Sequence, residues 1–130
     1  RLIPAMITNF LDDKLFVLKN PKFNRDLLYI EDYVDLIIKL LRSKKIINMN
    51  INIGSGKVIN LAKLAKIIYS KINRGSLNIP EINIITNSDV KDLYPNLKKF
   101  KKYIKDWNPK FNLDYGLNLT IEYYKKIKWF

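Results

Sequence analysis

The stretch from Tyr33 to Leu41 constrains the fold more than any other part of this sequence. It reads Tyr-Val-Asp-Leu-Ile-Ile-Lys-Leu-Leu, so a helix formed by it is apolar around most of its circumference. A surface helix carries a single apolar stripe, whereas a helix of this kind is buried on more than one side. Asp32 precedes the stretch and is predicted to be its N-cap. The sequence therefore predicts structure packed against more than one face of this helix.

The remaining segments alternate between helical and extended patterns, which predicts a mixed α/β fold in one domain spanning residues 1–130. Apolar residues recur at helical spacing over residues 3–11, after Asn60 and over residues 113–124, and a short lysine-rich helix is predicted after Pro95-Asn96. Short strands are predicted over residues 14–18, 26–30, 49–53 and 82–85, with the first two as candidates to pair, and residues 73–80 are predicted to be a loop.

Length and composition exclude several classes of protein. The chain has 130 residues, 48% hydrophobic and 28% charged, which describes one small folded domain and not a disordered tail. No apolar run approaches the ~18 residues that span a membrane. No signal peptide is recognisable, and the opening Arg1-Leu2-Ile3-Pro4 is expected to continue a longer chain. The sequence contains neither cysteine nor histidine, which excludes a zinc site, a His-based triad and a cysteine nucleophile, and no metal site is predicted.

The formal net charge of +12 has two explanations. Lysine, isoleucine and asparagine are abundant together, which is typical of an AT-rich coding bias. The charge also suits attraction to phosphate, in a nucleotide sugar or in a polymer.

Two short motifs resemble catalytic signatures but lack residues that those signatures require. Gly54-Ser55-Gly56-Lys57 lacks the earlier glycine and the Ser or Thr after the lysine that a phosphate-binding loop needs, so a tight glycine turn is predicted. Tyr94…Lys98 and Tyr124…Lys128 match the Tyr-x-x-x-Lys spacing, but neither has a serine about a dozen residues upstream. Neither motif is predicted to be catalytic.

The segment from Asn24 to Asp32 contains the most informative polar residue. Arg25, at the start of a predicted strand, is able to donate two hydrogen bonds to phosphate oxygens, because its planar donors match a phosphate edge. The alternative is a structural salt bridge with Asp26 or Asp32. The residue types alone do not decide between these two roles.

Residues Arg25 to Tyr33 resemble the Arg-Asp-x-x-Tyr/His-Val-Asp-Asp signature of the extended short-chain dehydrogenase/reductase family, the nucleotide-sugar epimerases and dehydratases. Three further stretches resemble family segments in the family's order: Arg1 to Pro4, Asn52 to Gly56, and Lys98 to Leu117 with its Trp107-Asn108-Pro109. Four motifs in order make the resemblance specific. It implies the α/β C-terminal, substrate-binding part of such an enzyme, lacking most of the Rossmann domain.

The resemblance also implies roles for individual residues. Arg25 would contact the pyrophosphate of a nucleotide sugar, and Arg1 and Leu2 would lie near its nucleotide portion. Phe16 and Leu18, alternate residues of one strand, would line the base pocket, where they could sandwich a pyrimidine. No catalytic and no cofactor-binding residue is expected within this chain.

The catalytic half is expected to lie outside these residues. The family's Gly-x-x-Gly-x-x-Gly turn, catalytic Ser/Thr and Tyr-x-x-x-Lys precede the region matched here, so NAD or NADP would bind to a missing N-terminal Rossmann half. The isolated chain is therefore expected to be inactive and to expose an apolar surface where that half packs. Two features depart from the family pattern: Asp106 replaces the glycine before Trp107, and residues 85–92 lack the second phosphate-binding arginine that would help to hold the sugar end. The resemblance further implies a cytoplasmic isomerase, lyase or oxidoreductase of carbohydrate biosynthesis, with a homodimer as the full-length form.

Two other functions remain as alternatives. A small basic nucleic-acid-binding domain would need aromatic residues among lysines on one exposed face, as Phe100, Tyr103, Tyr123 and Tyr124 would provide. An interaction domain would dock an acidic partner on the lysine-rich segment 98–102. The resemblance favours a nucleotide sugar, and neither nucleic acid nor membrane is the expected partner.

Overall fold

The computed structural model describes residues 1–43, 48–84 and 90–127. Helices and short strands follow one another along the chain in this order: α1 (Leu2–Leu11), β1 (Leu15–Val17), β2 (Asn24–Asp26), α2 (Ile30–Leu41), β3 (Val58–Asn60), α3 (Leu61–Ile72), β4 (Ser76–Asn78), β5 (Asp92–Leu93), α4 (Lys98–Tyr103) and α5 (Leu113–Ile127). The predicted mixed α/β fold class is confirmed. Among these helices, none has the length and apolar character that a membrane span requires.

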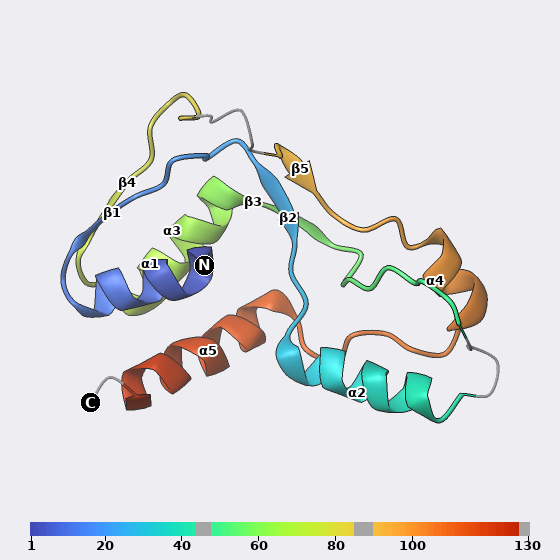
Figure 1. Ribbon diagram of the computed structural model, residues 1–130. Helices are drawn as coiled ribbons and strands as arrows, with labels where there is room; N and C mark the ends of the chain where they lie inside the picture. The colour runs from blue at the N-terminus through green and yellow to red at the C-terminus, as the bar shows by residue number, and fades with distance from the viewer. Residues whose placement is uncertain (44–47, 85–89, 128–130) are drawn as a thin grey trace.

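The strands form two small sheets. β1 pairs with β4 in parallel, and β2 lies between β3, its antiparallel neighbour, and β5, its parallel neighbour (Figure 1). The prediction that residues 14–18 pair with residues 26–30 is therefore wrong. Each of these strands takes partners from segments distant in sequence, and strands of three residues carry too little pattern to specify a partner.

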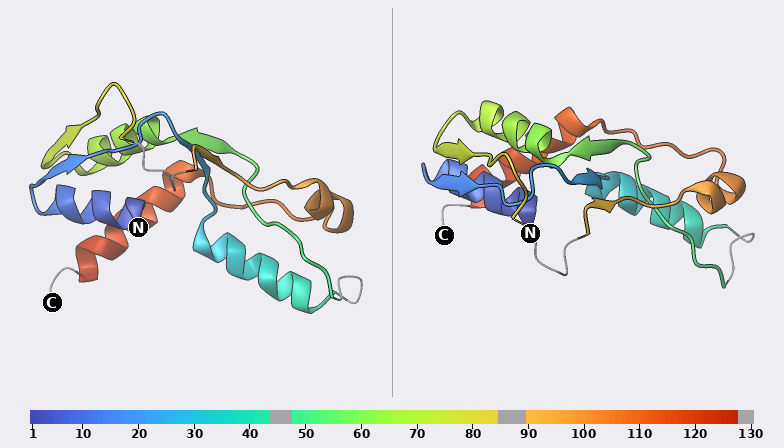
Figure 2. Two further views of the ribbon diagram at one scale, coloured as in Figure 1. Left: turned by 45° about the horizontal axis from the view of Figure 1, so that its top comes forward. Right: turned by 90° about the horizontal axis from the view of Figure 1, so that it is seen from above.

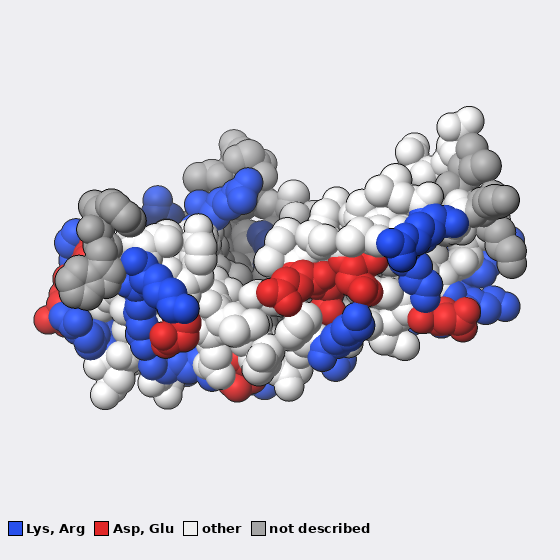
Figure 3. Space-filling model, turned by 90° about the horizontal axis from the view of Figure 1, so that it is seen from below, with Lys and Arg blue, Asp and Glu red and all other residues white. Residues whose placement is uncertain are grey.

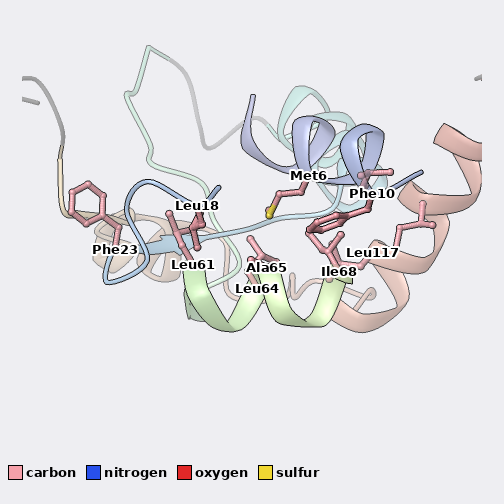
Figure 4. Close-up of a cluster of buried hydrophobic side chains, with 11 residues drawn as sticks. Met6, Phe10, Leu18, Phe23, Leu61, Leu64, Ala65, Ile68 and Leu117 are labelled. Carbon is pink, nitrogen blue, oxygen red and sulfur yellow. The ribbon is translucent and has the colours of Figure 1, made fainter. Parts of the chain in front are cut away.

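Two separate groups of buried side chains hold the fold together. α1, α3 and α5 gather at one end of the molecule and α2 and α4 at the other, with β2 and β3 between them (Figures 1 and 2). The larger group fills the three-helix end, where Leu64, Ala65 and Ile68 of α3 face Met6 and Phe10 of α1 (Figure 4). The helical stripes predicted for α1, α3 and α5 are confirmed by these contacts.

The smaller group joins α2 to α4 and the segment that follows it. Leu36 is fully buried there with Phe100, Ile104 and Trp107. The rings of Phe100 and Trp107 meet edge to face, with centroids 5.7 Å apart. Trp107 Nε1 donates a hydrogen bond of 2.9 Å to Asp35 Oδ2 on α2. Trp107 thus has a structural role, which accounts for its place in a recognisable motif.

The contacts of Asp35 predict a pH-dependent stability. Hydrogen bonds from Trp107 and then from Lys110 hold the pKa of Asp35 below its ordinary value of 3.8. A lowered pKa in the folded state means that the stabilisation is present above 3.8 and is lost as pH falls through the folded-state pKa. We expect Asp35→Asn to lower the urea midpoint slightly at neutral pH and to match the wild type in strong acid. A difference between the two proteins that stays constant from neutral pH to acid would contradict this assignment.

α2 differs from its prediction in an informative way. Of its apolar residues only Leu36 is buried, whereas Leu41 is 82% exposed and Val34 and Ile38 are about half exposed. The prediction of burial on more than one side is therefore wrong within the described residues. The side chains have the expected apolar character, but no described segment covers this second face of α2.

Asp32 does not cap its helix as predicted. α2 begins at Ile30, with Tyr29 at the N-cap, so Asp32 lies inside the first turn. Its carboxylate is 1% exposed and accepts hydrogen bonds from the backbone N–H groups of Lys110, at 2.8 Å, and Phe111, at 3.1 Å. Asp32 therefore ties the loop that precedes α5 to the start of α2.

Other boundaries also differ from the sequence predictions. Residues 49–53 and 82–84 are not strands, and Ile85 lies outside the described residues. The predicted loop over residues 73–80 contains β4, which pairs with β1. The predicted N-cap at Asn60 is confirmed, since its side chain accepts hydrogen bonds from Ala62 N and Lys63 N. The N-cap of α3 was thus predictable from the local sequence, whereas the N-cap of α2 and the strand pairing were not.

Candidate functional site

The structure brings four of the five predicted site residues into one cavity. Leu2 from α1, Phe16 from β1, Leu18 just after β1 and Arg25 from β2 line a hollow of about 370 Å³. The remaining lining residues are Val17, Lys19, Asn20, Phe23 and Leu61. We call this hollow the Arg25 cavity. Its walls are mostly apolar, with Arg25 and Lys19 as its cationic residues.

The fold explains why these side chains meet. Leu18, just after β1, packs with Leu61 at the start of α3 within the main core (Figure 4). Leu18 is only 2% exposed and can serve as a floor, while Phe16 is half-buried and packs edge-on against Phe10 at 6.1 Å. A flat or apolar group entering the cavity would therefore meet Phe16 and Leu2 at its walls.

Arg1 is the predicted site residue that lies elsewhere. It lines a neighbouring hollow of about 560 Å³ between the start of α1 and α5. That hollow is largely apolar and includes Tyr29, Tyr123 and Tyr124. The prediction for Arg1 thus has less geometric support than the prediction for Arg25.

Arg25 is held by backbone carbonyl groups and not by a carboxylate. Nη1 donates to Asn24 O at 2.7 Å and to Lys91 O at 2.9 Å, and Nη2 donates to Val90 O at 2.9 Å. Its Cζ atom lies 5.4 Å from the ring centroid of Phe23, a cation–π distance. A guanidinium has five N–H donors, so within the described residues these three bonds leave Nε–H and one Nη2–H for another acceptor.

The alternative role for Arg25, a salt bridge to Asp26 or Asp32, is wrong. The Asp26 carboxylate accepts hydrogen bonds from Ser55 N at 2.7 Å and Gly56 N at 2.8 Å. Asp32 is engaged by the loop before α5, as described above. Both carboxylates have structural partners, so the positive charge of Arg25 has no carboxylate counter-ion among the described residues.

The same contacts settle the role of the glycine turn at residues 54–57. Gly56 has a φ of +73°, and a Cβ on Gly54 would lie 2.4 Å from Cγ of Pro95. The backbone N–H groups that a phosphate would need are already bound to Asp26. The predicted tight turn is confirmed, although it leads into β3 and not directly into a helix.

Tyr29 is not prepared to act as a base. Burial raises the pKa of Tyr29, and the charge of Glu31 raises it further, so this phenol stays protonated at neutral pH. Tyr94 is 56% exposed at the start of the α4 segment. The Tyr124…Lys128 pair cannot be evaluated, because Lys128 lies outside the described residues.

Basic residues do not form a continuous stripe on the face drawn in Figure 3. Acidic side chains run along the middle of that face, between separate groups of lysine and arginine. A polymer-binding surface requires basic and aromatic residues along one track. This face therefore shows no basic track of that kind.

Sequence analysis missed Lys19, Asn20, Phe23 and Leu61. Phe23 alternates with Arg25 near β2, so its position beside the guanidinium could have been read from strand periodicity. Lys19 and Asn20 directly follow β1, and Leu61 opens α3. Their approach to the cavity depends on tertiary packing and left no signal in the sequence.

A larger hollow lies between α3 and residues 108–114. It measures about 650 Å³ and includes Lys57, Lys63 and Lys110 in its lining. It contains none of the five predicted site residues, and its lining does not overlap that of the Arg25 cavity. The Arg25 cavity is therefore the better candidate site, because an oriented guanidinium and apolar walls occur there together.

Comparison with known proteins places these features in a family context. Residues 1–54 match the NAD dependent epimerase/dehydratase family. UDP-glucuronic acid decarboxylase 1 of Xenopus tropicalis is 24% identical over 128 residues, which cover 93% of this chain and 29% of that protein.

Solved structures share the fold over almost the whole chain. Pal from Bacillus thuringiensis is 30% identical with a TM-score of 0.82, covering 98% of this chain and 40% of that one. A dTDP-glucose 4,6-dehydratase from Bacillus anthracis, solved with NAD, is 25% identical with a TM-score of 0.82, covering 100% of this chain and 41% of that one. The chain thus spans well under half the length of these relatives.

Proposed function

We propose that this chain, whose residues 1–54 match the NAD dependent epimerase/dehydratase family, is the substrate-binding part of a nucleotide-sugar epimerase or dehydratase. The observation that carries the proposal is the Arg25 cavity. It combines apolar walls with a guanidinium whose remaining donors face no carboxylate among the described residues. A nucleoside diphosphate has the matching chemistry, namely a flat base and an anionic pyrophosphate.

The four predicted residues of the cavity, together with Lys19, have separate parts in this proposal. Phe16 and Leu2 would flank the base, with Leu18 as the floor beneath it. Arg25 would donate to the pyrophosphate, and Lys19 would add positive charge at the cavity wall. Arg1 would approach the nucleotide from the neighbouring hollow. Held in this way, the nucleotide would direct its sugar toward the reacting groups of the complete enzyme.

The oxidation and reduction steps would need NAD or NADP, bound outside these residues. The described part of the chain does not fit a dinucleotide, because its glycine turn is already bound by Asp26. The dTDP-glucose 4,6-dehydratase relative was solved with NAD. In this proposal the cofactor and the catalytic groups belong to a Rossmann half, and this chain alone turns over no substrate.

The wider assignments follow from the family and complete the proposal. They are an isomerase, lyase or oxidoreductase activity in carbohydrate biosynthesis, a cytoplasmic location and a homodimeric full-length enzyme. Residues 1–130 would form a single substrate-binding domain. The similarity to a UDP-glucuronic acid decarboxylase and a dTDP-glucose dehydratase supports a nucleotide sugar as the ligand.

Calorimetric titration of the chain with UDP-, CDP-, dTDP- and GDP-sugars tests the proposal. We expect saturable binding of one nucleotide class. The affinity should be weak, because the chain would supply only part of the binding cleft. Titration with short single-stranded DNA and RNA under the same conditions tests the nucleic-acid alternative. Binding of nucleic acid with steep salt dependence, together with no response to any nucleotide sugar, would overturn the proposal.

The exposed face of α2 predicts self-association of the chain. Val34, Ile38 and Leu41 are 48%, 45% and 82% exposed, and contiguous apolar surface of this kind promotes association. We expect light scattering to show a concentration-dependent increase above the 15.4 kDa monomer mass. An Ile38→Glu variant should raise the apparent dissociation constant by about tenfold, because it places a charge on this face.

The matched control for this experiment is Leu15→Glu. Leu15 lies on β1 and is 56% exposed, so the control introduces the same charge at another exposed apolar position. It should leave the association unchanged. An association that Leu15→Glu weakens as strongly as the α2 variant would show that the α2 face is not responsible.

A further inference from the structure

Two of the three hydrogen bonds that hold the Arg25 guanidinium end on a segment far away in sequence. Val90 O and Lys91 O accept from Nη2 and Nη1, each at 2.9 Å, across sequence separations of 65 and 66 residues. This segment continues into β5, which lies parallel to β2 (Figure 1). The orientation of Arg25 therefore depends on keeping β5 beside β2.

β5 has few contacts of its own to keep it there. It is two residues long. Leu93 in the strand is 59% exposed, and Val90 just before the strand is 55% exposed. Burial of apolar surface therefore contributes little to its attachment. Asn24 provides two specific bonds instead, from its backbone N–H to Lys91 O at 3.2 Å and from Nδ2 to Asp92 Oδ1 at 2.8 Å.

We propose that Asp92, through its hydrogen bond to Asn24, is a positioning residue that orients Arg25 for a phosphate-bearing ligand. The Asp92 carboxylate holds β5 in register, with Asn24 opposite Asp92 and Arg25 opposite Leu93. That register places the Val90 and Lys91 carbonyls against the guanidinium. Arg25 is thereby ordered before binding, which removes part of the entropy that binding would otherwise lose. The inference rests on the proposed function for its ligand.

Simple electrostatics predicts the opposite effect for Asp92. A carboxylate close to an anion site repels the anion, so removing it should strengthen binding. Loss of a positioning bond should weaken binding, because Arg25 would no longer be held in place. The sign of the change therefore separates a positioning role from a simple charge effect.

Titration with UDP measures whether removal of the Asp92 carboxylate weakens or strengthens ligand binding. We expect Asp92→Ala to weaken UDP binding about fivefold, an amount that matches the net contribution of one ordinary hydrogen bond. Asn24→Ala should weaken binding similarly, and the double variant should be no weaker than either single variant. Asp92→Asn retains the acceptor without the charge, so its affinity should equal or exceed that of the wild type. Glu122→Ala makes the same change of charge on exposed α5 and should leave the affinity unchanged.

Tighter binding by Asp92→Ala, or an affinity of Asp92→Asn as weak as that of Asp92→Ala, would overturn the positioning role. A second readout needs no nucleotide. In ¹⁵N NMR spectra, hindered rotation should resolve the Nη signals of Arg25, which are assigned by their absence in Arg25→Lys. These signals should average in Asp92→Ala and persist in Asp92→Asn. Identical Arg25 signals in the wild type, Asp92→Ala and Asp92→Asn would contradict the inference. If the spectra differ as expected but no protein binds UDP, only the proposed function is contradicted.

Discussion

Replacing Asp32 by alanine is expected to lower the free energy of unfolding by about 3 to 5 kcal/mol. The carboxylate is 1% exposed and accepts hydrogen bonds from Lys110 N and Phe111 N. Its removal leaves two backbone N–H groups without their acceptor at the junction between α2 and the loop before α5. Since small domains have total stabilities of about 5–15 kcal/mol, this change should bring the chain close to unfolding. Urea denaturation followed by tryptophan fluorescence measures the effect.

Two further variants separate this anchoring role from a general effect of losing an aspartate. Asp32→Asn keeps one acceptor oxygen and should lose about half as much stability. Asp114→Ala removes an exposed carboxylate that pairs with Lys71 at 2.6 Å, and surface pairs contribute about 0–1 kcal/mol. An Asp32→Ala variant no less stable than Asp114→Ala would show that the two bonds to the loop contribute little.

Arg25→Ala is expected to weaken nucleotide diphosphate binding by at least about 100-fold. The expected loss is large because the substitution removes the two donors that remain for pyrophosphate, along with one of the two positive charges of the cavity. Arg25→Lys restores the charge without the planar fork and should recover binding only in part, to about tenfold below the wild type. Calorimetry with the nucleotide that the wild type binds best provides the measurement.

The control for this prediction changes the same charge elsewhere. Arg74 is exposed in the turn after α3, so Arg74→Ala lowers the net charge equally but should alter the affinity less than about twofold. Thermal unfolding of Arg25→Ala checks that the loss of its carbonyl contacts leaves the chain folded. If Arg74→Ala and Arg25→Ala weaken binding equally, the effect of Arg25 is only its contribution to the overall charge.

The start and the buried face of α3 were predicted correctly from the sequence. Asn60 at the N-cap and the apolar stripe of α3 are features of neighbouring residues, so capping and periodicity identify them directly. The strands behave differently. β2 has only three residues, and its partners β3 and β5 come from segments more than 30 residues away. Their pairing depends on the packing of the helices, which no local pattern encodes.

α2 shows a different limit of sequence reasoning. Its composition predicts burial on more than one side, and the described chain buries only the side that contains Leu36. The apolar character of the helix was predicted correctly. The sequence does not show which faces of the helix are covered by other segments of the same chain. In the proposed function a Rossmann half would pack against this second face.

The candidate site was predictable to the extent that it follows strand alternation and a family signature. Phe16, Leu18 and Arg25 belong to that pattern, and they meet in one cavity. The sequence left two roles possible for Arg25, namely phosphate binding and a salt bridge to Asp26 or Asp32. The hydrogen-bond partners of these two aspartates in the structure decide between the roles. The carbonyl groups that orient Arg25 were unpredictable for the same reason as the strand pairing, since β5 is short and distant.

The most direct test of the central claim is to map where UDP binds. Titration of the ¹⁵N-labelled chain with UDP should shift the backbone amide signals of residues 16–20 and 23–25, which surround the Arg25 cavity. The signals of residues 108–114, beside the larger lysine-lined hollow, should stay unchanged. Shifts confined to residues 108–114 would contradict the assignment of the nucleotide site to the Arg25 cavity.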